Sequence, residues 1–240
     1  ATNQSRPSAA IDPQPTLAAA ECSGERAAAC ATLARRYEQG HGVPRDLSRA
    51  HSLYEQACDG GHGLACGRLG RLYYDGRGVP QNYERAAALF VRGCGQGSLE
   101  TCGILGYVHA HGQGVQQDYA RARVLYRQAC DGGVLRICGT LGMMYANGRA
   151  GPRDETRARQ LLQQACDGGS SEACSNLGAI YDGGLGSPPD HGRASELFGR
   201  ACDDGYLMGC VNLAGLYLNG HGVPQDYQIA RELFGDACDS

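Results

Sequence analysis

The sequence contains no lysine, so all 22 of its basic residues are arginine. The absence of an amine excludes Schiff-base chemistry, the lysine of a nucleotide-binding phosphate loop, and the Ser-x-x-Lys centre of serine β-lactamases and penicillin-binding enzymes. No apolar run approaches the ~18 residues that a membrane-spanning helix requires. A formal charge of -3 over 240 residues is untypical of a nucleic-acid-binding protein, so no nucleic-acid partner is expected.

Glycine and cysteine are the two residues in excess, with 37 and 13 copies. Glycine reaches about twice its usual share of ~7%. The cysteines form pairs whose members lie 8 residues apart, and the first members recur every 36 residues from Cys22 to Cys238. A constant period along the whole chain predicts a repeat array, so we expect one solenoid.

Each 36-residue unit predicts a pair of helices. A leucine and then an aromatic residue or histidine follow the second cysteine on one helical face, as at Leu69 and Tyr73. A glycine loop with a proline ends this first helix, and Asp or Asn caps the second, which carries an Ala-x-x-Leu motif. The glycine excess therefore arises because each unit repeats the same glycine-containing loops. Ala150 and Gly151 replace the usual Gly-Val, which predicts a loop of different shape there.

The repeated motifs are Leu-Gly-x-x-Tyr, Gly-x-Gly-Val-Pro-x-Asp, Ala-x-x-Leu and Ala-Cys-Asp-Gly-Gly. Together they resemble the Sel-one-like repeat family, a relative of the tetratricopeptide repeats, and the paired cysteines resemble its bacterial cysteine-rich, Hcp-type branch. The resemblance implies an all-α fold, a right-handed α/α solenoid of 36-residue helical hairpins crosslinked by disulfides. It implies little about function, because such arrays are scaffolds on which different sites are built.

The predicted domain organisation is a flexible N-terminal lead at 1–15 followed by one solenoid at 16–240. The lead is polar, contains three prolines and lacks the 36-residue period. The solenoid is expected to begin with a partial helix at 16–22 and to continue with six repeats from about 26 to 240.

The cysteines also indicate the compartment. Thirteen regularly placed thiols are unsuited to a reducing cytosol, so we predict disulfides and a periplasmic or secreted protein. Zinc binding by these cysteines is disfavoured, because the pair spacing exceeds the usual ~2–4 residues and no histidine recurs beside the pairs.

Two disulfide connectivities fit a helical hairpin. Bridges within the hairpin would run from Cys30–Cys58 to Cys210–Cys238 and leave Cys22 free. Bridges across the Asp-Gly-Gly turn would leave Cys238 as the free thiol. The resemblance implies the second arrangement, and its short loops also lose less chain entropy on closing. Its bridges are Cys22–Cys30, Cys58–Cys66, Cys94–Cys102, Cys130–Cys138, Cys166–Cys174 and Cys202–Cys210.

The leading functional prediction is a non-catalytic scaffold that binds a protein or peptide segment in a concave groove lined by the first helix of each hairpin. Positions two and five residues after the second cysteine lie on a face that need not be apolar, and they vary strongly between units. At these positions arginine can donate hydrogen bonds to a carboxylate, and asparagine can donate to and accept from a peptide backbone. Tyrosine offers a flat apolar surface for contact. The predicted ligand-binding residues are Arg35, Arg68, Arg71, Tyr107, Asn176 and Asn212.

The alternative, implied by the resemblance alone, is binding or weak hydrolysis of β-lactam or peptidoglycan-like ligands. No catalytic residue, metal site or cofactor is predicted. His109-x-His111 is the only close histidine pair, it lacks the Asp-His of a metallo-β-lactamase motif, and His109 occupies the aromatic packing position. Charge is uneven, near +7 over 26–165 and near -8 over 166–240, which points weakly to a charged partner.

Overall fold

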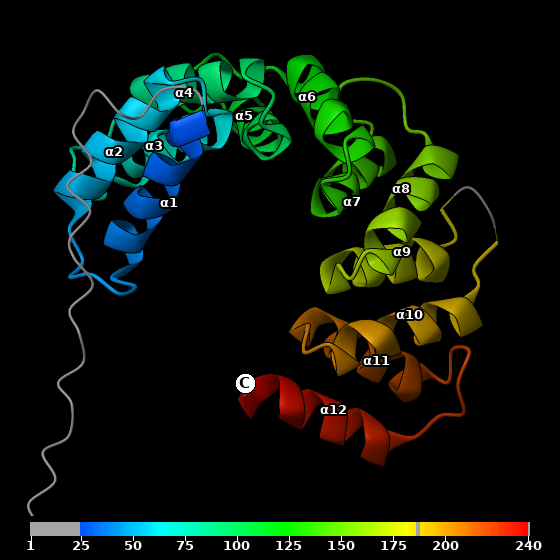
Figure 1. Cartoon of the computed structure of the whole chain (residues 1–240). Helices are drawn as coiled ribbons and strands as arrows, with labels where there is room; N and C mark the ends of the chain where they lie inside the picture. The colour runs from blue at the N-terminus through cyan, green and yellow to red at the C-terminus, as the bar shows by residue number, and fades with distance from the viewer. Residues whose placement is uncertain (1–24, 186–187, 240) are drawn as a thin grey trace, which may run out of the picture.

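The structure is a computed structural model that describes the backbone of residues 25–185 and 188–239 and the side chains of residues 26–185 and 188–235. The predicted lead at 1–15 and partial helix at 16–22 lie outside the described residues. Within the described part the chain forms only α-helices and loops (Figure 1). The helices are α1 (Glu25–Gln39), α2 (Leu47–Asp59), α3 (Gly63–Asp75), α4 (Tyr83–Gly95), α5 (Leu99–His111), α6 (Tyr119–Asp131), α7 (Leu135–Ala146), α8 (Glu155–Asp167), α9 (Ser171–Gly183), α10 (His191–Asp203), α11 (Leu207–Asn219) and α12 (Tyr227–Asp239).

The helices pack in chain order as hairpins. Each odd-numbered helix packs most closely on the even-numbered helix that follows it, and that helix packs on the next odd-numbered one. Odd-numbered helices of neighbouring hairpins also touch directly, such as α3 with α5 and α9 with α11. Figure 1 shows the resulting curved array, from α1 at one end to α12 at the other. The predicted α/α solenoid is confirmed, and the odd-numbered helices line its inner side.

Small residues let the two helices of a hairpin approach closely. Leu69 and Leu105, the leucines of two Leu-Gly motifs, are buried as predicted. A Cβ atom added to Gly70 would lie 2.7 Å from the Phe90 ring of the partner helix. The glycine that follows the leucine in four of the units therefore makes room for a large side chain from the second helix, which is packing that the motif alone does not reveal.

Polar residues cap the even-numbered helices as predicted. In each case a side-chain oxygen accepts a hydrogen bond from the backbone N–H three residues further on, which satisfies one of the free donors of the first turn. The capping residues are Asp46, Asn82, Asp118, Asp154, Asp190 and Asp226.

The glycine loops after the odd-numbered helices use two left-handed positions. In the loop after α3 these are Gly76 (φ 68°) and Gly78 (φ 75°). The loop after α7 keeps both conformations, at Gly148 (φ 65°) and Ala150 (φ 72°), although the second residue is not glycine. Ala150 therefore keeps the backbone conformation of the usual glycine and carries strain there. The expected change of loop shape is seen at Gly151, whose φ of 150° is not shared by the valine that other loops have at this position.

Five disulfides join the end of an even-numbered helix to the start of the next odd-numbered helix. They are Cys58–Cys66, Cys94–Cys102, Cys130–Cys138, Cys166–Cys174 and Cys202–Cys210. The arrangement across the turn is confirmed, and the within-hairpin alternative is wrong because Cys58 is bonded to Cys66. Cys30 is disulfide-bonded as well, while Cys22 and the thiol of Cys238 lie outside the described part.

The five disulfides that lie within the described residues are typical of an oxidising, extracytoplasmic compartment. Among the described helices, none combines the length and the apolar character needed to cross a membrane.

Candidate functional site

Three adjoining clefts open on the inner side of α1 to α7. The N-terminal cleft, of about 220 Å³, includes Arg35 and Arg68 in its lining. The linking cleft, of about 120 Å³, shares Arg68 with it. The central cleft, of about 340 Å³, shares Arg71, Ile104 and Arg136 with the linking cleft. Because neighbouring clefts share lining residues, they form one continuous surface, which we call the inner groove.

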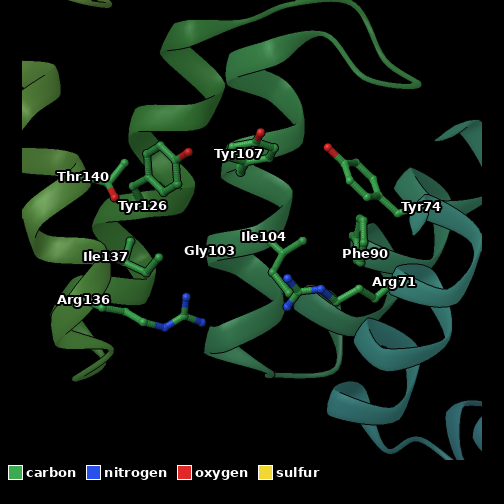
Figure 2. A pocket seen from close by; sticks show the side chains of 10 residues that line it. All are labelled: Arg71, Tyr74, Phe90, Gly103, Ile104, Tyr107, Tyr126, Arg136, Ile137 and Thr140. Carbon is green, nitrogen blue, oxygen red and sulfur yellow. The ribbon is translucent and has the colours of Figure 1, made fainter. Parts of the chain in front are cut away.

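The central cleft combines an apolar floor with polar groups at two edges. Figure 2 shows the Arg71 and Arg136 side chains reaching toward one another from α3 and α7. Three tyrosines lie along the other edge, and Phe90 and Ile137 contribute buried apolar surface. The tyrosines are Tyr74, Tyr107 and Tyr126. The cleft therefore places cationic donors and phenol groups around a surface suited to an apolar side chain.

The Tyr74 and Tyr126 phenols of the central cleft stay neutral at physiological pH. Burial raises the pKa of Tyr126 to about 12, with a smaller contribution from Tyr107. Burial also raises the pKa of Tyr74, and Tyr107 adds to the rise. Loss of solvation disfavours the charged phenolate, which explains both directions. Tyr74 donates its hydroxyl hydrogen to Gln113. Tyr107 is 44% exposed, so its ring is available to a ligand.

The arginines of the inner groove have few partners of their own. Arg71 approaches Asp75 with an Nε–Oδ2 distance of 4.0 Å, and both side chains are exposed, so this pair contributes little. Arg35, Arg68 and Arg136 form no ion pair with any residue of the described part. Glu100 is the carboxylate in the linking cleft, where three arginines outnumber it. The groove is therefore a cationic surface with unused donors.

Glu38 is bonded to Tyr54, a lining residue of the N-terminal cleft, and both of its carboxylate oxygens have hydrogen-bond partners. Its Oε2 accepts a hydrogen bond from the Tyr54 hydroxyl at 2.7 Å, and its Oε1 accepts one from Arg77 at 3.0 Å. Burial followed by this hydrogen bond to Glu38 raises the pKa of Tyr54, while Arg68 and Arg35 oppose the rise. Because Arg77 neutralises Glu38, Arg35 and Arg68 remain open to an external acceptor.

Four of the six residues predicted from the sequence meet in the inner groove. Arg35, Arg68, Arg71 and Tyr107 all line it. The other two, Asn176 and Asn212, are half-buried on α9 and α11 and do not line these clefts. The Nδ2 group of Asn212 donates to the Ser175 hydroxyl at 3.3 Å, across the contact between the two helices.

Arg136, Tyr74 and Tyr126 are groove residues that the sequence analysis missed. The signal for Arg136 is present in the register, because it lies one helical turn before Thr140, a position already placed on the variable face. Extending that face by one turn would have included it. Tyr74 and Tyr126 occupy positions that also suit core packing, so the sequence does not distinguish the two roles. Both residues line the central cleft because the curvature of the array brings their helices together there.

His109 occupies the packing position expected from its register. Its ring is half-buried and its Nδ1 atom has no hydrogen-bond partner in the structure. Burial, assisted by Arg121, lowers the pKa of this imidazole, so it stays neutral at physiological pH. His111 lies one turn further on, where its Nδ1 atom is 2.9 Å from the Tyr107 carbonyl oxygen.

Comparison with known proteins identifies the repeats. The Sel1 repeat model matches six segments, at 27–62, 63–98, 102–134, 141–170, 171–206 and 207–240. No curated protein matches the chain.

Similar solved structures come from several bacteria. One is c5321, a protective antigen of uropathogenic Escherichia coli with an SLR fold (TM-score 0.82, 30% identity, 89% of this chain and 46% of that one). Another is a Sel1 repeat protein from Oxalobacter formigenes (TM-score 0.81, 26% identity, 88% and 84%). Helicobacter pylori cysteine rich protein B gives a TM-score of 0.43 at 24% identity over 48% and 89%. This chain thus spans about half the length of the Escherichia coli protein.

Proposed function

This chain belongs to the Sel1 repeat family, whose scaffold is typical of protein-interaction domains, and we propose that it binds an extended, acidic polypeptide segment in the inner groove. In this proposal the chain is a scaffold and carries out no reaction. The observation that carries the proposal is the set of arginines without ion pairs, Arg35, Arg68 and Arg136, aligned along one continuous groove.

Arginine favours carboxylate as the recognised group. Its planar guanidinium donates two parallel hydrogen bonds to a carboxylate, and such charge-assisted bonds are stronger than neutral ones. Arg68, Arg71 and Arg136 surround the linking cleft, so one or two acidic side chains of a ligand would find several donors. The apolar floor of the central cleft suits a hydrophobic side chain placed next to these acids.

The form of the groove favours a polypeptide over a small molecule. The clefts follow one another along α1, α3, α5 and α7, with each hairpin supplying one step. An extended chain presents side chains at regular intervals and matches such a repeated surface. Asn176 and Asn212 continue the same register toward the C-terminal end, and their contact with a ligand stays a prediction. We place this interaction in the periplasm or outside the cell, in line with the five disulfides.

Binding of peptides with graded acidity tests the proposal. The probes are fluorescein-labelled 12-residue peptides with zero, two or four acidic residues among apolar ones, and fluorescence anisotropy measures their affinity for the oxidised chain. We expect affinity to rise with the number of acids. Arg68→Ala with Arg71→Ala should lower it at least tenfold, because hydrogen bonds to charged groups contribute roughly 1.5–3 kcal/mol each.

A matched control removes the same charge elsewhere. Arg45 and Arg127 are exposed and lie outside the three clefts, so Arg45→Ala with Arg127→Ala should leave the affinity within a factor of two. Equal losses in both double variants would mean that only net charge matters, and the groove proposal would fail. Nitrocefin turnover by the same preparation would instead support the β-lactam alternative.

A further inference from the structure

A second group of chemically distinctive side chains lies at the other end of the molecule, between the last two complete hairpins. Asp182 is in α9, His191 begins α10, and His221 follows α11. Each offers one ligand atom, and the three atoms lie within 4.8 Å of one another. The His191 Nδ1 atom is 2.7 Å from the Asp182 carboxylate, and the two imidazole rings are 4.7 Å apart between centroids.

The repeat register explains why these residues meet. Three register positions recur at each hairpin junction. They are the eighth residue after the second cysteine, the first residue of the next even-numbered helix, and a loop residue 39 positions after the first of them. At the first junction these positions hold Glu38, Leu47 and Arg77, and Glu38 pairs with Arg77 at 3.0 Å. The junction is thus a fixed meeting point whose occupants change from repeat to repeat.

Only one junction in the described part fills all three positions with metal-ligating side chains. The second junction holds Tyr74, Tyr83 and Gln113, with a Tyr74–Tyr83 ring contact and a hydrogen bond to Gln113. The next two contain alanine at the first position, at Ala110 and Ala146. The set of Asp182, His191 and His221 is therefore a local departure at a position that elsewhere serves packing or a single polar contact.

The ligand set suits a particular class of ion. Two imidazoles with one carboxylate favour borderline divalent metals such as Zn²⁺, Co²⁺ or Ni²⁺ over Mg²⁺ and Ca²⁺, which prefer oxygen alone. Zinc bonds of ~2.0–2.1 Å in tetrahedral geometry separate ligand atoms by about 3.3 Å, a spacing that small rotations of these side chains reach. Asp182 and His191 are only partly exposed, at 38% and 33% of the side chain, so an ion would also have room for water.

We propose that Asp182, His191 and His221 bind one divalent transition-metal ion of the zinc class, which joins the last two complete hairpins. Cys202–Cys210 already links the end of α10 to the start of α11. His191 and His221 lie at the opposite end of this helix pair, so the ion fastens the end that the disulfide leaves open. The site is independent of the inner groove, because none of its residues lines a groove cleft.

Metal titration of the intact oxidised chain tests this site. The chain carries no affinity tag and is alkylated with iodoacetamide, so that neither a histidine tag nor a free thiol binds metal. Equilibrium dialysis against Zn²⁺ should give one bound ion per chain. Bound Co²⁺ should give the visible absorption band that is typical of a low-symmetry site. Zn²⁺ should raise the unfolding temperature, and a chelator that removes the Zn²⁺ should reverse this rise.

The variants use residues that the repeat itself places at the same positions. His191→Tyr introduces the residue found at Tyr83 and Tyr119, and His221→Gln introduces the one found at Gln113, so both should fold. Each should lower Zn²⁺ affinity at least tenfold and abolish the thermal shift. His41→Ala removes the register equivalent of His221 in the first hairpin and should change nothing. The proposal would be overturned if the parent chain bound no Zn²⁺ or if His191→Tyr bound it equally well. The three residues would then form only the His191–Asp182 hydrogen bond and the His191–His221 ring stacking.

Discussion

The basic part of the solenoid, 26–165, and the acidic part, 166–240, share one framework and differ in what they display. Both are built from hairpins with capped helices and bridges 8 residues apart in sequence. The first carries a formal charge near +7 and the inner groove, whereas the second is near -8. The framework therefore gives both parts the same fold, and the two parts differ in charge and in the residues at a few variable positions.

Single register positions show how the change is made. Two residues after the second cysteine, the basic part has Arg68 in a cleft and the acidic part has Asn212 bonded to Ser175. At the hairpin junction, the first pair is Glu38 with Arg77 and the last is Asp182 with His221. The same register positions thus hold an ion pair at one junction and the proposed metal ligands at another.

The largest expected effect is the loss of a disulfide, and it should be the same in both parts. Closing an 8-residue separation stabilises the native chain by about 2–3 kcal/mol through the unfolded state. Cys58→Ala with Cys66→Ala, and separately Cys166→Ala with Cys174→Ala, should each lower the free energy of unfolding by this amount in urea titrations. A loss confined to one part would show that the framework is not shared.

The next effect should separate the two parts. Arg136→Ala removes an arginine without an ion pair from the central cleft, and we expect the affinity for an acidic peptide to fall about tenfold, or ~1.4 kcal/mol. Arg200→Ala removes an arginine from α10 that lies 3.6 Å from Asp167, and peptide affinity should not change. Anisotropy titrations of both variants make the comparison, and a loss with Arg200→Ala would place binding on the acidic part.

A smaller effect concerns Asn212. Replacing it with alanine removes the 3.3 Å hydrogen bond to the buried Ser175 hydroxyl, which should cost about 1 kcal/mol of unfolding free energy. The same variant measures its predicted role in binding. Peptide affinity that falls in parallel would extend the groove to α11, whereas unchanged affinity would confine it to the basic part.

The smallest effect is a gain in stability at Ala150. Its φ of 72° belongs to the left-handed region, where the corresponding loop residues Gly78 and Gly222 carry no Cβ. Ala150→Gly should stabilise the chain by about 0.5–1 kcal/mol, because relief of strain exceeds the entropy that glycine loses on folding. Differential scanning calorimetry detects such a shift, and a lowered unfolding temperature would contradict it.

The sequence predicts most of the fold because the period repeats every physical constraint. Leu69 and the cap at Asn82 both follow from spacing and residue chemistry, and the structure places them as expected. Spacing also predicts that Cys94 and Cys102 form disulfides. The pairing itself needed the family resemblance, since spacing allowed two arrangements.

The groove was only partly predictable. Helical phase identifies Arg68 and Arg71, but not which clefts close around them, because curvature brings α3, α5 and α7 together. Asn212 occupies the same register as Arg68, yet its short side chain reaches Ser175 instead of lining a cleft. His191 and His221 lie 30 residues apart, so no local sequence motif contains both of them. Only the register of the hairpin junction indicates that they lie close together.

Site-specific photo-crosslinking tests the central claim most directly. A benzophenone amino acid replaces Tyr107, which is 44% exposed in the inner groove, or Val124, which is 51% exposed on α6 and lines none of the three groove clefts. With the tightest-binding acidic peptide, the account predicts a crosslink from position 107 that excess unlabelled peptide suppresses, and none from position 124. Crosslinking from position 124 alone would contradict the account and place the ligand on the outer helices.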